Sequence, residues 1–173
     1  GWVRTFKGLW EGAAGDAAHQ PRCCDASDGT RRPRVAIVAC LDSPHPEIGE
    51  LETFVPLFEN AGFDCSVFDV RELTFDGQCL HGRHALAGDS DVAIDCIWRF
   101  CIVVDLLQHW DEVQDLVEAL RQEKVLMIGS FATQIVHDKQ LFAVLRRPAA
   151  RALLTEEERT FIDRHIPFTA FLD

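Results

Sequence analysis

The sequence predicts an α/β protein with a doubly wound, mainly parallel sheet and a three-layer architecture. Two observations support this prediction. Short apolar runs, such as residues 35–40, are continuous rather than alternating, which is typical of strands buried on both faces of a parallel sheet. Between such runs, apolar residues recur at helical spacing, as they do over residues 48–58. Because strands and helices alternate, we expect helices on both faces of one sheet.

The first strand is expected at residues 35–40 and the second at residues 63–70. A helix that begins at Ile48 separates them and ends near Gly62, where glycine can adopt the left-handed cap conformation. Since the link between helix and second strand is short, we expect the two strands to be parallel and joined by a right-handed crossover.

The remaining sequence predicts a hairpin and further strands and helices. Asp76 and Gly77 separate two short apolar segments and form a strong hairpin turn signal. Thr155, with Glu158 three residues later, completes the pattern of a capping box at a helix N-terminus. The other expected elements are strands at 92–100 and 125–129 and helices at 103–120, at 135–145 and from residue 155 onward.

The domain organisation predicted from these patterns is simple. Residues 34–173 are expected to form one α/β domain, and residues 1–33 a linker or the end of a preceding element. Residues 12–33 are rich in Gly, Ala, Asp and Pro and show no apolar periodicity, which is typical of a loop. The only methionine is Met127, so we expect the sequence to be a piece of a longer polypeptide.

Charge and cysteine usage exclude several classes of function. The net charge of −11 would repel a polyanion, so no nucleic-acid partner is expected. No apolar run approaches the roughly 20 residues of a membrane span, so no membrane partner is expected. Basic clusters at 31–34 and 146–147 are interpreted as solvated ends of elements.

The seven cysteines include no C-x-x-C pair, so no metal site is expected. Their odd number favours a reducing, cytoplasmic location.

In doubly wound sheets, ligands bind beyond the carboxyl ends of the strands. The segment after the first strand contains Asp42, Ser43 and His45 close together in a Pro-containing turn. These side chains are candidates to bind the substrate. The alternative is a stiffened turn in which Asp42 or Ser43 only caps the next helix.

Two further candidates follow later strands. Arg99 stands at the end of an apolar strand, where its planar guanidinium suits a carboxylate or phosphate, although it could instead pair with Asp95, Asp105 or a neighbouring Glu. Gln134 and Lys139 lie where a strand leads through a loop into a helix, a position that favours anions. Alternatively, Lys139 is an exposed side chain paired with Asp138 or with Glu residues elsewhere.

Four motifs together resemble a known family. They are Asp95-x-Ile-Trp-Arg-Phe100, Gly129-Ser-Phe-x-Thr-Gln-x-x-His-Asp-Lys139-x-Leu-Phe, Leu154-Thr-x-Glu-Glu158 and His165-Ile-Pro-Phe-Thr169. In order and spacing they are similar to the substrate-side, pre-ATP-grasp region of glutathionylspermidine synthase-like ATP-grasp ligases, which has a Rossmann-like fold. The resemblance covers residues 34–173.

The resemblance implies a C–N ligase in which ATP and Mg²⁺ activate a carboxylate as an acyl phosphate that an amine then attacks. Arg99 would orient the substrate carboxylate, and Lys139, with Gln134 nearby, would lie close to the nucleotide phosphates. Members usually carry a second Arg where this sequence has Phe100. No Gly-rich phosphate loop is present, so the chain is expected to supply no catalytic residue, to bind no nucleotide by itself and to depend on the ATP-grasp domain of the same polypeptide.

Two other functions remain open from the sequence. The first is a stand-alone flavodoxin-like or receiver-like binding or regulatory module with its site near Asp42. A receiver domain would carry an Asp after its third strand, where this sequence has Arg99. The second is a Rossmann-type oxidoreductase, which the absence of a G-x-G-x-x-G pattern disfavours.

Overall fold

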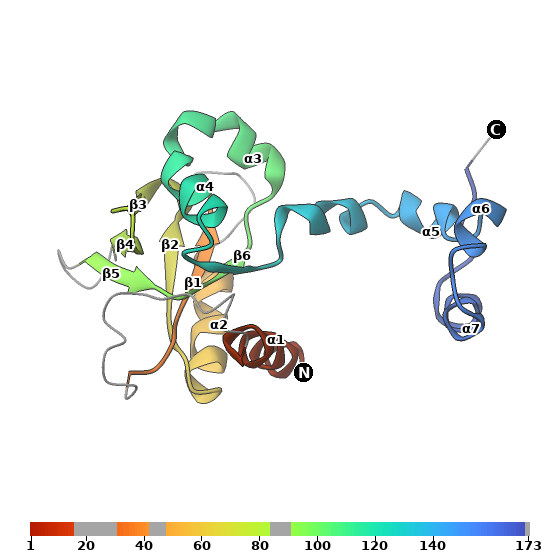
Figure 1. Ribbon diagram of the computed structural model, residues 1–173, viewed down its shortest axis with the longest axis horizontal. Coiled ribbons are helices and arrows are strands. Elements are labelled where there is room, and N and C mark those ends of the chain that lie inside the picture. Colours follow the sequence, from red (N-terminus) through yellow and green to blue (C-terminus); the bar gives the residue numbers. More distant parts are fainter. Residues whose placement is uncertain (16–30, 42–47, 84–90, 172–173) are drawn as a thin grey trace. The chain divides into compact units, whose positions relative to one another are not determined.

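The computed structural model describes residues 1–15, 31–41, 48–83 and 91–171 (Figure 1). Asp42, Ser43 and His45 therefore lie outside the described residues. The chain divides into two compact units, Gly1–Ser130 and Phe131–Asp173, and each is described by itself. This boundary differs from the one expected at residue 34.

The N-terminal unit is a mixed α/β structure built on a four-stranded parallel sheet of order β2-β1-β6-β7. The strands are β1 (Arg34–Ala39), β2 (Asp64–Asp69), β6 (Cys96–Arg99) and β7 (Leu126–Ile128). The helix α2 (Ile48–Asn60) connects β1 to β2, and these two strands are parallel as expected. Val38 pairs with Phe68 on one side and with Arg99 on the other, so β1 lies between β2 and β6.

The central strand β1 is buried on both faces, which explains its uninterrupted apolar sequence. Val35, Ile37 and Ala39 join a cluster that includes residues of α2 and of α1 (Trp2–Gly15). Ala36 and Val38 join another cluster, which includes residues of α4 (Gln114–Arg121). The alternation of side chains along β1 therefore brings helices to opposite faces of the sheet.

The helix α1 is part of the N-terminal unit, although residues 1–33 were expected to be a linker or the end of another element. Phe6 is only 3% exposed and stacks edge-on against Phe58 of α2 at 4.9 Å. The Trp2 ring lies 4.6 Å from the Trp98 ring of β6. Because α1 buries aromatic rings against both α2 and the sheet, it belongs to the core of this unit.

A second sheet is antiparallel and has the order β3-β4-β5. It consists of β3 (Leu73–Phe75), β4 (Leu80–Arg83) and β5 (Asp91–Ile94), and the 3₁₀-helix η1 (Val70–Glu72) leads into it from β2. The hairpin expected at Asp76 and Gly77 is confirmed. Gly77 has a φ of 90°, and Asp76 Oδ1 accepts the backbone N–H of Gln78 at 2.8 Å, which holds the turn.

The single strand expected at 92–100 is wrong, since β5 and β6 belong to different sheets and separate at Asp95. Asp95 is 5% exposed, and its carboxylate accepts the backbone N–H of Arg34 at 2.7 Å and an Arg31 N–H at 3.0 Å. Arg31 is thus bound to a buried acid, and the interpretation of this basic cluster as a solvated end is wrong for Arg31. The buried carboxylate marks the point where the chain leaves one sheet for the other.

The single helix expected at 103–120 is also wrong, since α3 (Val103–Gln108), the 3₁₀-helix η2 (Trp110–Glu112) and α4 divide this segment. The side-chain amide of Gln114 donates to the backbone carbonyl of Trp110 at 2.7 Å. In a continuous helix that carbonyl would accept the backbone N–H of Gln114. A side chain therefore occupies the acceptor that the helix would need.

The C-terminal unit contains the 3₁₀-helix η3 (Phe131–His137), α5 (Gln140–Val144), α6 (Pro148–Arg151) and α7 (Glu156–His165). One helix was expected at 135–145, and this is wrong. Asp138 Oδ1 accepts the backbone N–H of Gln140 at 2.8 Å, which begins a new helix after η3. Among the described residues of this unit, Ala143 and Ile162 are the buried apolar side chains.

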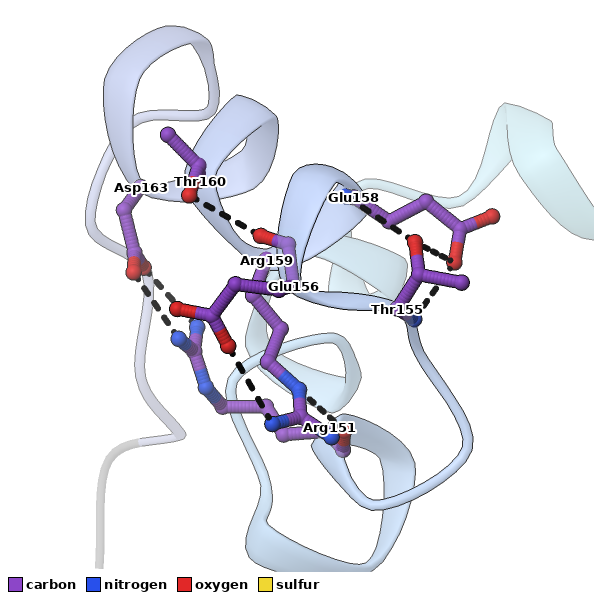
Figure 2. Close-up of polar contacts among 7 residues, drawn as sticks. All are labelled: Arg151, Thr155, Glu156, Glu158, Arg159, Thr160 and Asp163. Carbon is purple, nitrogen blue, oxygen red and sulfur yellow. Dashed lines mark hydrogen bonds and ion pairs between the residues drawn. The ribbon is translucent and has the colours of Figure 1, made fainter.

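The helix α7 begins with the capping box that the sequence predicted (Figure 2). Thr155 Oγ1 accepts the backbone N–H of Glu158 at 3.3 Å, and Glu158 Oε2 accepts the backbone N–H of Thr155 at 2.8 Å. Both ends of the box are thus satisfied. In the described part of the chain, no helix has the length and apolar character needed to cross a membrane.

Candidate ligand-binding edge of the parallel sheet

The carboxyl ends of β1 and β6 lie side by side in the sheet. From β1 the chain continues through α2 to β2 on one side, whereas β6 lies on the other side. This is the change of strand order at which ligands bind in open α/β sheets. Arg99 ends β6 at this position, and the segment with Asp42, Ser43 and His45 follows β1, outside the described residues.

The guanidinium of Arg99 is held by backbone carbonyl groups at this edge. Its Nε donates to the carbonyl oxygen of Gly129 at 2.6 Å, and its Nη1 donates to the carbonyl oxygen of Cys101. Gly129 follows β7 and has a φ of 82°, a conformation that favours glycine. Asp95, one of the alternative partners considered for Arg99, instead forms an ion pair with Arg31.

These contacts fix the position of the Arg99 guanidinium through two backbone carbonyl groups. The side chain is half-buried, and two of its N–H donors have their directions set by the protein. A guanidinium fixed in this way is pre-organised for an anion, since binding would require little further ordering of the side chain.

Asp69, at the end of β2, forms a second polar cluster that the sequence analysis missed. Asp69 is 4% exposed and accepts Nε and Nη2 of Arg71 at 2.9 and 2.7 Å. It also accepts the backbone N–H of Leu41 at 3.2 Å, which ties the end of β1 to the end of β2. The Asp-x-Arg spacing at a strand end was the available signal, because such a pair can form a bidentate ion pair.

The ionisation of Asp69 follows from these contacts. Burial alone would raise the pKa of its carboxyl group, but the hydrogen bonds from Arg71 and Leu41 outweigh burial and hold the pKa below the ordinary value of 3.8. Asp69 is therefore a carboxylate at neutral pH. It anchors the beginning of the segment that carries Asp42, Ser43 and His45.

Cys101 also lies at this edge, two residues after the end of β6. Burial raises the pKa of its thiol to about 12, although the nearby Arg99 acts in the opposite direction. A thiol with such a pKa carries almost no thiolate at neutral pH, so Cys101 is not activated as a nucleophile. Here it serves as a small apolar side chain of the core.

The two candidate cofactor-binding residues lie in the C-terminal unit. Gln134 belongs to η3 and is half-buried, and Lys139 occupies the N-cap position of α5 and is exposed. Within the described residues, Lys139 forms no ion pair, so the alternative pairing with a neighbouring acid is not observed there. Gln134 and Lys139 belong to the C-terminal unit, whereas Arg99 belongs to the N-terminal unit.

An open groove of about 440 Å³ lies between α6 and α7 in the same unit. Arg151 binds Asp163 through two hydrogen bonds of 2.8 Å, and Arg159 Nε donates to the backbone carbonyl of Arg151 at 2.8 Å (Figure 2). These contacts join one helix to the other. The groove is thus lined by groups that already stabilise the helix pair.

The described residues contain no group of three or more His, Cys, Asp or Glu side chains arranged to hold a metal ion. Comparisons of this chain with protein-family models, with curated proteins and with solved structures find no match.

Proposed function

We propose that this chain is the substrate-side domain of an ATP-dependent C–N ligase that resembles glutathionylspermidine synthase. In this proposal the mixed α/β unit is a doubly wound, three-layer, pre-ATP-grasp-like domain of a cytoplasmic enzyme. The observation that carries the proposal is the fixed Arg99 guanidinium at the change of strand order between β1 and β6. It is supported by the four sequence motifs, whose order and spacing resemble this family.

In the proposed enzyme, Arg99 binds the carboxylate of the acid substrate. The carbonyl groups of Gly129 and Cys101 hold the guanidinium in place before the substrate arrives. Asp42, Ser43 and His45 contact polar groups of the acid or of the amine, and Asp69 fixes the start of their segment through the Leu41 N–H. Because Phe100 is apolar, the carboxylate has one guanidinium in this motif rather than two.

ATP, when bound by such a ligase, supplies the phosphoryl group that activates the carboxylate before the amine attacks. The described residues offer no cluster for Mg²⁺, so the proposal assigns Mg²⁺ and the nucleotide to the ATP-grasp domain of the same polypeptide. Gln134 and Lys139 are proposed to face the nucleotide phosphates from the C-terminal unit. The chain by itself is proposed to be inactive.

The test uses the complete polypeptide that the gene encodes. The enzyme is incubated with Mg-ATP and with pooled carboxylic acids and amines, and ADP release is measured. We expect ADP release that requires both an acid and an amine. We expect Arg99→Lys to raise the KM for the acid by about tenfold or more, because an ammonium cannot reproduce a planar bidentate contact. The matched variant Arg121→Lys, at an exposed position of α4, should leave the KM unchanged.

A flavodoxin-like or receiver-like binding module is the second candidate, because the strand order of the parallel sheet is also the order found in flavodoxin-like folds. The two functions are distinguished by adding FMN or acetyl phosphate to this chain. Flavin binding with a shifted absorbance spectrum, or a phosphorylated aspartate, in the absence of any acid- and amine-dependent ADP release would support the module and contradict the ligase.

A further inference from the structure

A row of exposed apolar side chains runs along α3 into η2. Val104, Leu107 and Trp110 are 56%, 61% and 47% exposed. Val104 and Leu107 are three positions apart in α3 and so lie on the same side of this helix, and Trp110 begins η2 three residues further along the chain. Ile102, which immediately precedes α3, is also exposed at 40%. In Figure 1, α3 lies with α4 at the top of the N-terminal unit.

These exposed side chains are not part of the hydrophobic core. Leu106 and Val113, which are 4% and 1% exposed, already attach α3 and η2 to the core cluster. Val104, Leu107 and Trp110 therefore face away from the packing that holds the segment in place. A contiguous set of large apolar side chains on a surface is typical of an interaction site, because each side chain gains free energy when a partner removes it from water.

The surroundings of the row are acidic. Residues 100–120 contain five acidic side chains and neither Lys nor Arg, and the acids are Asp105, Asp111, Glu112, Asp115 and Glu118. Within the described part of the chain, Asp105 and Asp111 form no ion pair with a basic side chain. Asp105 and Asp111 are the chain neighbours of Val104 and Trp110, and these two acids, here called the acidic rim, have no basic partner within the described residues.

We propose that the Val104–Leu107–Trp110 row docks an amphipathic helix of a partner protein whose apolar face is flanked by Lys and Arg. The spacing of the row suits apolar side chains of a second helix, and the acidic rim pairs with the basic flanks. A second copy of this chain is disfavoured, because two acidic rims would face each other and each chain carries a net charge of −11. An anionic lipid surface is disfavoured for the same reason.

This inference is independent of the proposed ligase function, because it concerns α3 and η2 rather than the polar groups at the strand ends. Loss of peptide docking would leave the assignment of Arg99 untouched. Conversely, an inactive ligase would leave the docking surface untouched.

The test measures binding of a fluorescein-labelled peptide to the full chain by fluorescence anisotropy. The probe is a synthetic amphipathic helix of Leu and Lys, about 18 residues long, and the control peptide has the same composition in scrambled order. We expect the amphipathic peptide to bind at least about tenfold more tightly than the scrambled peptide, since both have the same charge but only one presents an apolar stripe.

Two variants locate the surface. We expect Leu107→Asp to weaken binding by about tenfold or more, whereas Leu57→Asp, at a 45% exposed position of α2, should leave binding unchanged. The double variant Asp105→Asn/Asp111→Asn should bind the amphipathic peptide with a weaker dependence on salt concentration. Equal binding of both peptides, equal loss with Leu57→Asp, or adhesion of the chain to phosphatidylserine vesicles would overturn the proposal. Concentration-dependent dimerisation that Leu107→Asp abolishes would overturn it as well.

Discussion

Arg99 Nε donates a hydrogen bond of 2.6 Å to the backbone carbonyl of Gly129. The last paired residues of β6 and β7 are Trp98 and Ile128, so this bond joins the strands one residue beyond their ladder. The positive φ of Gly129, 82°, places the carbonyl at this position. A side chain thus extends the connection between two strand ends at the edge where we propose that substrate binds.

The structural contribution of Arg99 can be measured apart from any substrate. Replacement by Ala leaves the Gly129 and Cys101 carbonyls without their donor, and we expect a loss of about 1–3 kcal/mol in the free energy of unfolding. The measurement is guanidinium chloride unfolding followed by circular dichroism. Arg121→Ala, which removes an exposed side chain paired with Glu118, should change stability by less than about 0.5 kcal/mol. Equal free energies of unfolding for Arg99→Ala and the unaltered chain would show that the bond to Gly129 does not stabilise the fold.

The Asp69–Arg71 pair is expected to matter more for stability, because Asp69 is almost fully buried. Asp69→Asn keeps the size of the side chain but removes the charge that binds Arg71 twice. We expect a loss on the order of 3–5 kcal/mol, the range seen when one partner of a buried ion pair is removed. Arg71→Ala in the same background should cost little more, since the two side chains act as one unit. Additive losses in this double-mutant cycle would be inconsistent with coupling between them.

Stability should fall when the pH is lowered below about 4. The pKa of Asp69 is held below 3.8 in the folded chain, and hydrogen bonds from the N–H groups of Cys79 and Gln78 lower the pKa of Asp76 to about 2. Both groups bind a proton more readily in the unfolded chain, so their contribution is complete above the unfolded pKa and is lost as pH falls through the folded pKa. The urea concentration at the midpoint of unfolding, determined at several pH values between 5 and 2, measures this loss. A midpoint that stays constant over this range would contradict the assignment.

Local signals in the sequence predicted local parts of the fold. The continuous apolar run of β1, the turn at Asp76 and Gly77 and the capping box at Thr155 each depend on residues within a few positions of one another, and each is confirmed. The two broken elements depend on particular side chains instead. Asp95 ends β5 by binding Arg31, 64 residues earlier in the chain, and Gln114 interrupts a helix by binding the Trp110 carbonyl. Apolar periodicity carries no information about either contact.

For the candidate site, the sequence likewise predicted a local feature but not the long-range contact. That Arg99 ends a strand followed from the apolar run before it, but its bond to Gly129 requires the order of β6 and β7 in the sheet. Asp69 does not stand out in the sequence, because an acid at a strand end is common and the importance of this one arises from its burial. Burial could not be inferred for a single acidic residue, since most are exposed.

Gly82 of β4 offers a test of packing between the two sheets. A Cβ atom added at this position would lie 2.6 Å from Cδ1 of Phe68, a ring that is 3% exposed. We expect Gly82→Ala to destabilise the chain by about 1–3 kcal/mol, since the buried ring has to move. A Cβ atom added to Gly8, inside α1, would have no neighbouring atom within 4 Å, so Gly8→Ala should instead stabilise the chain by about 0.5–1 kcal/mol. Thermal unfolding compares the two, and a matching sign of their effects would contradict this account.

The two compact units should differ sharply when they are separated. In the described part of the C-terminal unit, only Ala143 and Ile162 are buried apolar residues, whereas Ile135, Leu153 and Phe168 are 72%, 87% and 81% exposed. So little burial cannot offset the conformational entropy of ordering the segment. We expect residues 131–173 alone to lose their helical circular dichroism gradually on heating, without a cooperative transition. Residues 1–130 contain both large core clusters and should unfold cooperatively, with a midpoint within a few degrees of that of the full chain. A cooperative transition in residues 131–173, or its absence in residues 1–130, would contradict the assignment of the core to the N-terminal unit.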